Sequence, residues 1–127
     1  TGKKNNVESK TTDSCAALMI FEINGVEWHV EFVAPGSNLL RRSDGSLSVG
    51  VTDNLTRTVY LSNLLHGRFL DKVISHELCH VWCFMNNIYM PIEVEEQVAD
   101  FLATYGRDIF DMADFILSNL TGNEIYA

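Results

Sequence analysis

Hydrophobic and polar residues alternate along a short segment near the start of the chain. In residues 26–33 apolar side chains fill every second position, with Val26, Trp28, Val30 and Phe32 separated by Glu27, His29 and Glu31. This period of two is typical of a strand with one face toward water. The segment Ala17–Ile23 precedes it across Asn24-Gly25, a dipeptide that accepts the positive φ angles of a tight turn. We therefore predict a β-hairpin, with His29 on its exposed face.

A second pair of segments, Leu47–Thr52 and Arg57–Ser62, shows the same alternation around Asp53-Asn54. It predicts a second hairpin, and so four antiparallel strands before any helix. The rest of the chain has helical spacing and predicts three helices, at about Gly67–Asn87, Ile92–Tyr105 and Asp108–Leu120, with breaks at Asn86-Asn87, Pro91 and Gly106. Strands followed by helices predict an α+β fold, in which a small antiparallel sheet packs on one helix with two further helices.

The length of 127 residues fits one domain. Residues 1–14 are polar and predict a flexible N-terminal tail, with a single domain over residues 15–127. The longest apolar runs are far shorter than the roughly 20 residues that span a bilayer, and no export signal is evident. We therefore expect a cytoplasmic protein that does not enter a membrane.

The net charge limits the classes of binding partner, and the cysteine count predicts the redox state of the thiols. The net charge of −8 disfavours direct binding to nucleic acid, because phosphate contacts require basic residues. The cysteines are Cys15, Cys79 and Cys83, an odd count that predicts reduced thiols. Cys79 and Cys83 lie four apart on a predicted helix, and we expect both to be buried as small apolar side chains.

The sequence His76-Glu77-Leu78-Cys79-His80 carries the candidate chemistry. Histidines four apart on a helix share one face, so both imidazoles can bind one zinc ion at about 2.0–2.1 Å. Glu77 is rotated by about 100° and can reach a water on the metal without being a ligand. This is the arrangement of the H-E-x-x-H motif, with Glu77 as general base. The alternative is two core histidines, each with its own hydrogen-bond partner.

A catalytic zinc site needs a third protein ligand. No histidine follows His80, so the ligand must be acidic or, less readily, a cysteine. Glu93, Glu96 and Asp100 share one face of the second predicted helix, where a cation would relieve their repulsion. Glu95 points elsewhere and is predicted to be solvated. The spacing alone does not choose between Glu93 and Glu96.

His76-Glu77-x-x-His80 followed by Glu96-x-x-x-Asp100 resembles the gluzincin branch of zinc peptidases. The string Glu96-x-x-Ala99-Asp100-x-Leu102-Ala103 further resembles the ImmA/IrrE group of minimal peptidases found in bacteria and phages. The resemblance covers roughly Arg57–Ala103. It implies a zincin-like fold, a Zn²⁺ cofactor, Glu96 as the third ligand, and Asp100 as a hydrogen-bond partner of a zinc-bound histidine.

The same resemblance implies a metallopeptidase acting on a protein or peptide substrate. Some members of the group are implicated in removing phage-type or element-borne repressors, so a regulatory protein of a phage or mobile element is an expected substrate. By analogy with zincins, the strand Arg57–Ser62 is expected at the cleft. Four side chains are candidates for stabilising the oxyanion: Tyr60, His66, Tyr89 and Tyr105.

Three alternatives stay open at this point. The domain could be a non-catalytic zinc-binding regulatory module that sequesters a protein partner, although an intact Glu77 favours an enzyme. It could hold a structural zinc, with Cys79 or Cys83 at the fourth position. Finally, two histidines and one carboxylate also suit iron or manganese.

Overall fold

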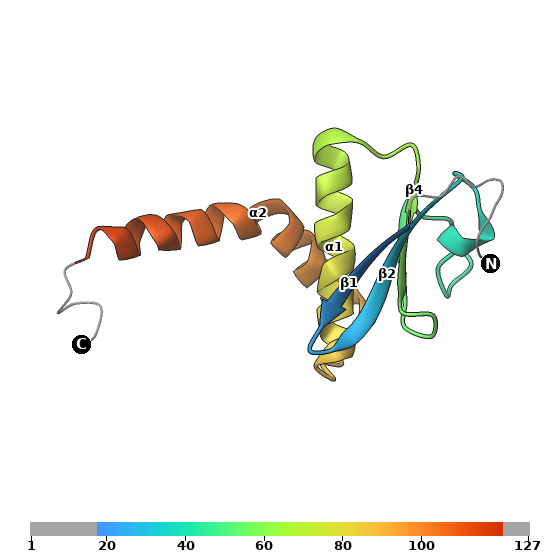
Figure 1. The fold of residues 1–127 in the computed structure, drawn as a ribbon, viewed down its shortest axis with the longest axis horizontal. Helices are drawn as coiled ribbons and strands as arrows, with labels where there is room; N and C mark the ends of the chain where they lie inside the picture. Colours follow the sequence, from blue (N-terminus) through green and yellow to red (C-terminus); the bar gives the residue numbers. More distant parts are fainter. Residues whose placement is uncertain (1–17, 121–127) are drawn as a thin grey trace.

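The computed structural model describes residues 18–120, so the tail predicted over residues 1–14, Ala17 at the start of the first predicted strand, and Cys15 lie outside the described part. Four strands precede two helices (Figure 1). The elements in chain order are β1 (Leu18–Ile23), β2 (Val26–Val33), the short 3₁₀ helix η2 (Asn38–Leu40), β3 (Gly50–Asp53), β4 (Thr58–Ser62), α1 (Gly67–Met85) and α2 (Ile92–Ser118). The α+β class predicted from the sequence is confirmed.

Both predicted hairpins are present. β1 pairs with β2 in antiparallel register, and β3 pairs with β4 in the same way. The turn between β1 and β2 places Asn24 at φ 51° and Gly25 at φ 81°, the positive values that a two-residue hairpin of this kind requires.

The two hairpins join in a way that the sequence analysis did not predict. The strand order is β1-β2-β4-β3, and β2 runs parallel to β4. The sheet is therefore mixed, and the prediction of an antiparallel sheet was wrong. The local alternation specifies each hairpin, but the pairing of β2 with β4 depends on contacts between residues far apart in the chain.

α1 covers one face of the sheet and builds the main core with it (Figure 1). Buried side chains from the sheet meet buried side chains from α1 in one cluster, which includes Trp28, Val59, Leu61, Val73 and Val81. β4 is buried along its whole length, because the η2 segment contacts it as well. This central strand is why the core can form with few residues.

α2 packs against α1 through a second, smaller cluster of Cys79, Cys83 and Ala99. The buried cysteines agree with the sequence prediction. The prediction of a helix break at Gly106 was wrong, because α2 is one helix from Ile92 to Ser118, and up to residue 120 it is the only helix that follows α1. Glycine inside a helix costs about 1 kcal/mol relative to alanine, which lowers helix stability without ending the helix. Within residues 18–120, no helix has the length and apolar character needed to cross a bilayer.

Candidate metal centre

His76, His80 and Glu96 converge where α1 faces the first turns of α2. His76 Nε2 lies 3.0 Å from Glu96 Oε1, and His80 Nε2 lies 3.1 Å from Glu96 Oε2. The two Nε2 atoms are 3.2 Å apart. The helical spacing of the histidines brings them to one face, and the packing of α2 on α1 brings the carboxylate to that face.

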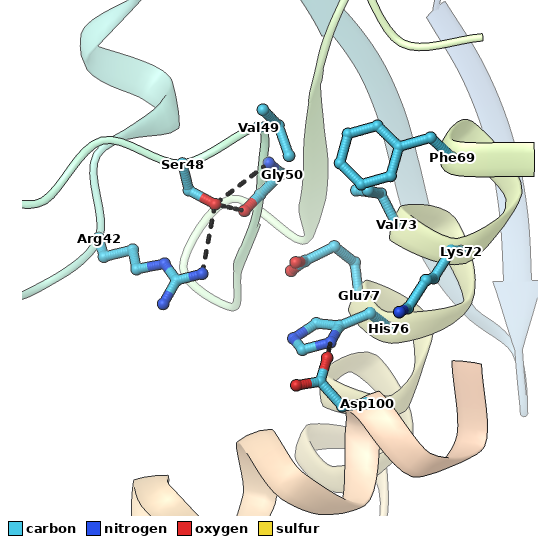
Figure 2. A pocket seen from close by; sticks show the side chains of 10 residues that line it. All are labelled: Arg42, Ser48, Val49, Gly50, Phe69, Lys72, Val73, His76, Glu77 and Asp100. Atoms are coloured by element: carbon cyan, nitrogen blue, oxygen red, sulfur yellow. Dashed lines mark hydrogen bonds and ion pairs between the residues drawn. The ribbon is translucent and has the colours of Figure 1, made fainter. Parts of the chain in front are cut away.

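The outer nitrogens of both histidines contact further carboxylates. His76 Nδ1 lies 2.8 Å from Asp100 Oδ1, where Figure 2 draws the contact. His80 Nδ1 lies 2.5 Å from Glu95 Oε2. The contact of Asp100 is the one that the motif resemblance implies. The prediction that Glu95 is solvated was wrong, because its side chain is only 13% exposed and contacts His80.

These outer contacts define the chemistry at the centre of the group. An ionised carboxylate accepts hydrogen bonds and cannot donate them, so Nδ1 of each histidine is the donor. In the neutral imidazole, Nε2 is then an acceptor. Two Nε2 lone pairs and a carboxylate therefore face one another at about 3 Å, an arrangement that requires a cation between them or extra protons on the rings.

The donor set and its spacing fit zinc. Ligand atoms that bind a tetrahedral zinc at 2.0–2.1 Å lie roughly 3.3 Å apart, and the two Nε2 atoms are 3.2 Å apart. The contacts of 3.0 and 3.1 Å run to different oxygens of Glu96. Within the described residues, His76, His80 and Glu96 form the group whose candidate ligand atoms all lie within 4.8 Å of one another. Glu93 is exposed and is not part of this group.

The two cysteines do not belong to the group either. Cys79 and Cys83 of α1 pack against Ala99 of α2. Burial raises the pKa of the Cys79 thiol to about 11, from an ordinary value of 9.0, and the neighbouring Cys83 adds to the shift. Burial also raises the pKa of Cys83.

Glu77 lies on the face of α1 next to the one that carries His76 and His80, and it contacts β3. It is buried, with 6% of its surface exposed. Its Oε1 accepts a hydrogen bond from Thr52 Oγ1 at 2.7 Å. β3 approaches closely at Gly50, where an added Cβ would lie 2.8 Å from Val73 Cγ1 and 3.2 Å from Glu77 Cγ. Glycine at position 50 is what lets the strand come so near the carboxylate.

A cleft of about 230 Å³ opens beside Glu77 (Figure 2). Its lining combines the N-terminal half of α1, the segment that leads into β3, and Asp100: Arg42, Ser48, Val49, Gly50, Phe69, Lys72, Val73, His76, Glu77 and Asp100. This volume is below the roughly 300 Å³ at which small-molecule pockets begin. The cleft suits part of a longer ligand better than a whole small molecule.

The strand at the cleft is β3. The sequence analysis expected the strand Arg57–Ser62 there, but β4 lies inside the sheet between β2 and β3. β3 is an edge strand, and Gly50 at its start lines the cleft. An edge strand offers unpaired backbone groups to an extended peptide.

The four candidate oxyanion donors lie elsewhere. None of them belongs to the cleft lining. Tyr60 is buried beside Thr56, with 3.2 Å between the two hydroxyl oxygens. His66 Nδ1 contacts the carbonyl oxygen of Leu64, and Tyr89 is 80% exposed. Tyr105 packs on Phe101.

Comparisons of the chain with protein-family models, with curated proteins and with solved structures find no match.

Proposed function

We propose that this domain is a zinc-dependent metallopeptidase with a zincin-like fold, in which His76, His80 and Glu96 bind the metal. One observation carries the proposal. Three acceptor groups from two helices face one another at 3.0–3.2 Å, while separate carboxylates occupy the outer nitrogen of each histidine. Without a metal ion, the same arrangement needs an extra proton on at least one ring to hold the Nε2 atoms and the carboxylate together.

A bound zinc ion supplies Lewis acidity, lowering the pKa of a coordinated water and polarising a carbonyl group. Asp100 and Glu95 hold the imidazole rings in the orientation that leaves both Nε2 atoms free to bind, a role that commonly strengthens metal affinity. These two carboxylates contribute to the site without being ligands themselves.

Glu77 is the proposed general base. It neighbours His76 in sequence, and it lines the cleft rather than the ligand group. The Thr52 hydroxyl donates a hydrogen bond to its Oε1, and a carboxylate held in this way supports the proposed role of taking a proton from the attacking water. It then passes that proton to the amine that leaves when the peptide bond breaks.

The shape of the cleft supports a protein or peptide substrate. A shallow cleft bordered by an edge strand can hold an extended chain by strand addition along β3. On the motif resemblance, we propose a regulatory protein of a phage or mobile element as the substrate.

The proposal is tested with the zinc-loaded protein and its Glu77→Gln variant. Each is incubated with a proteome-derived peptide library and with repressor proteins of phages and mobile elements, and cleavage is read by mass spectrometry. The wild type should cleave, and a chelator should stop it. Glu77→Gln should lose at least about 100-fold in rate, the usual contribution of general acid–base catalysis, with its zinc content unchanged.

Glu93→Gln is the matched control, because Glu93 is an exposed glutamate of α2 close to the site. It should keep both zinc and activity. Full activity in Glu77→Gln would remove the peptidase proposal. A zinc-loaded wild type that binds a repressor without cleaving it would instead favour a module that sequesters a partner.

A further inference from the structure

The cleft beside Glu77 has a positively charged side chain on each wall. Lys72 comes from α1, and Arg42 comes from the segment between η2 and β3. In Figure 2 the Lys72 ammonium extends toward the part of α1 that carries His76 and Glu77, and the Arg42 side chain reaches into the cleft from the opposite wall. The two cations thus flank the space in which a substrate would lie.

Helix geometry sets the position of Lys72. It precedes His76 by four residues, so the two side chains share one face of α1, one turn apart. Phe69 and Val73 line the same wall and give it an apolar surface. A substrate group near Lys72 would therefore meet a charge and an apolar patch together.

Arg42 differs from its neighbour Arg41 in what its side chain does. Arg41 holds the loop together, donating from Nε to Asn38 Oδ1 at 3.2 Å and from Nη1 to the Gly45 carbonyl oxygen at 2.8 Å. The Arg42 guanidinium donates to Ser48 Oγ from Nη2 at 3.4 Å. A guanidinium has five N–H donors, so this weak contact leaves Arg42 able to bind an anion in two-point fashion.

Neither Lys72 nor Arg42 forms an ion pair within residues 18–120, although Arg42 lies close enough to Asp44 to help lower the pKa of that carboxyl. The lining also carries two carboxylates, each with a hydrogen-bond partner: Glu77 accepts from Thr52, and Asp100 contacts His76. In a chain with a net charge of −8, two unpaired cations around one cleft favour a negatively charged ligand group there.

We infer that the site selects substrates with an acidic side chain close to the scissile bond and an apolar residue beside it. The inference rests on the proposed peptidase function. The Asp or Glu carboxylate binds between Arg42 and Lys72, and the apolar residue packs on Phe69 and Val73. The rival role for Lys72, stabilising the oxyanion on every substrate alike, is separated by the test below.

The test compares cleavage of peptide pairs that differ only by Glu or Gln near the cleaved bond. Cleavage sites from a proteome-derived peptide library supply the pairs. For the wild type, kcat/KM should be about tenfold higher for the Glu peptide, mainly through KM, and the preference should shrink as salt concentration rises. Arg42→Gln with Lys72→Gln should abolish the preference, so that the Glu peptide and the Gln peptide are cleaved with equal kcat/KM. Arg68→Gln, an exposed cation of α1 outside the cleft lining, is the control and should behave as wild type.

Two results overturn the inference while leaving the peptidase proposal intact. One is wild-type cleavage with no acidic residues enriched near the cleaved bonds. The other is a Lys72→Gln variant whose kcat falls equally for both peptides, which would make Lys72 an oxyanion donor. If the wild type cleaves nothing, the peptidase proposal fails instead. Binding of the peptide library to zinc-loaded Glu77→Gln protein then decides the inference, which is overturned if the bound peptides are not enriched in acidic residues.

Discussion

Two adjacent faces of α1 carry residues with different proposed roles. Toward α2, His76 and His80 face Glu96 and are held from behind by Asp100 and Glu95. Toward β3, Glu77 faces Thr52 and the cleft. The face toward α2 carries the candidate metal ligands. The face toward β3 carries Glu77, the proposed base, and lines the cleft proposed to bind the substrate. Changes on the α2 side should therefore alter metal affinity, whereas changes on the β3 side should alter stability or turnover with the metal still bound.

The strongest of these side-specific effects is expected from the carboxylates behind the histidines. Glu95→Gln and Asp100→Asn keep the shape of each side chain and remove its charge. Losing such a partner typically weakens metal binding by about 10–100-fold. Glu95 should have the larger effect, because its side chain is 13% exposed and that of Asp100 is 67% exposed. Zinc titration against a competing chelator measures both, and equal affinities in all three proteins would break the comparison.

On the β3 side, Gly50→Ala should destabilise the fold. The new Cβ would lie 2.8 Å from the Val73 side chain, and a β-branched valine has little freedom to move away. Overpacking of this kind costs about 1–3 kcal/mol. Urea unfolding should show the loss. The variant should still bind zinc, since the atoms nearest the new Cβ belong to Val73 and Glu77 and not to a ligand residue. A parallel loss of zinc affinity would contradict the separation of the two faces.

Much of this arrangement was predictable from the sequence. The Asn24-Gly25 turn, the α1 helix and the shared face of Glu96 and Asp100 follow from local spacing, and the structure agrees with each. The contact of Glu95 with His80 was not predicted, because only the face of α2 shared by Glu93, Glu96 and Asp100 was expected to meet the histidines. Two histidines one turn apart present a wide face, so a neighbour of Glu96 on a different face of α2 can still contact the outer nitrogen of His80.

What could not be predicted involves contacts between distant segments. The parallel pairing of β2 with β4 places β3 at the edge of the sheet beside the cleft, and no local pattern distinguishes this from a purely antiparallel order. The positions of Arg42 and Lys72 on opposite walls of the cleft depend on the same topology. At Gly106 the local sequence predicted a helix break that does not occur. The helical preference of the neighbouring residues outweighs the cost of one glycine, and α2 continues through it.

The smallest expected effect concerns pH and the contact between the two helices. The pKa of Cys79 is raised to about 11 by burial, so the folded state holds its proton more tightly than the unfolded chain does. The contribution of Cys79 to stability is fully present below pH 9 and should be lost as pH rises toward 11. Urea unfolding of zinc-loaded protein across this range measures the effect, with Cys79→Ala as the comparison. A stability that falls equally in both proteins would assign the loss to other groups.

The central claim is that His76, His80 and Glu96 share one metal ion. Elemental analysis of purified protein, together with the Glu96→Ala and Glu93→Ala variants, tests it most directly. The wild type and Glu93→Ala should each carry about one zinc per chain, the stoichiometry of a single site with three protein ligands, and Glu96→Ala should carry far less after dialysis against a weak chelator. Equal zinc in all three proteins, or none in the wild type after loading, would contradict the account.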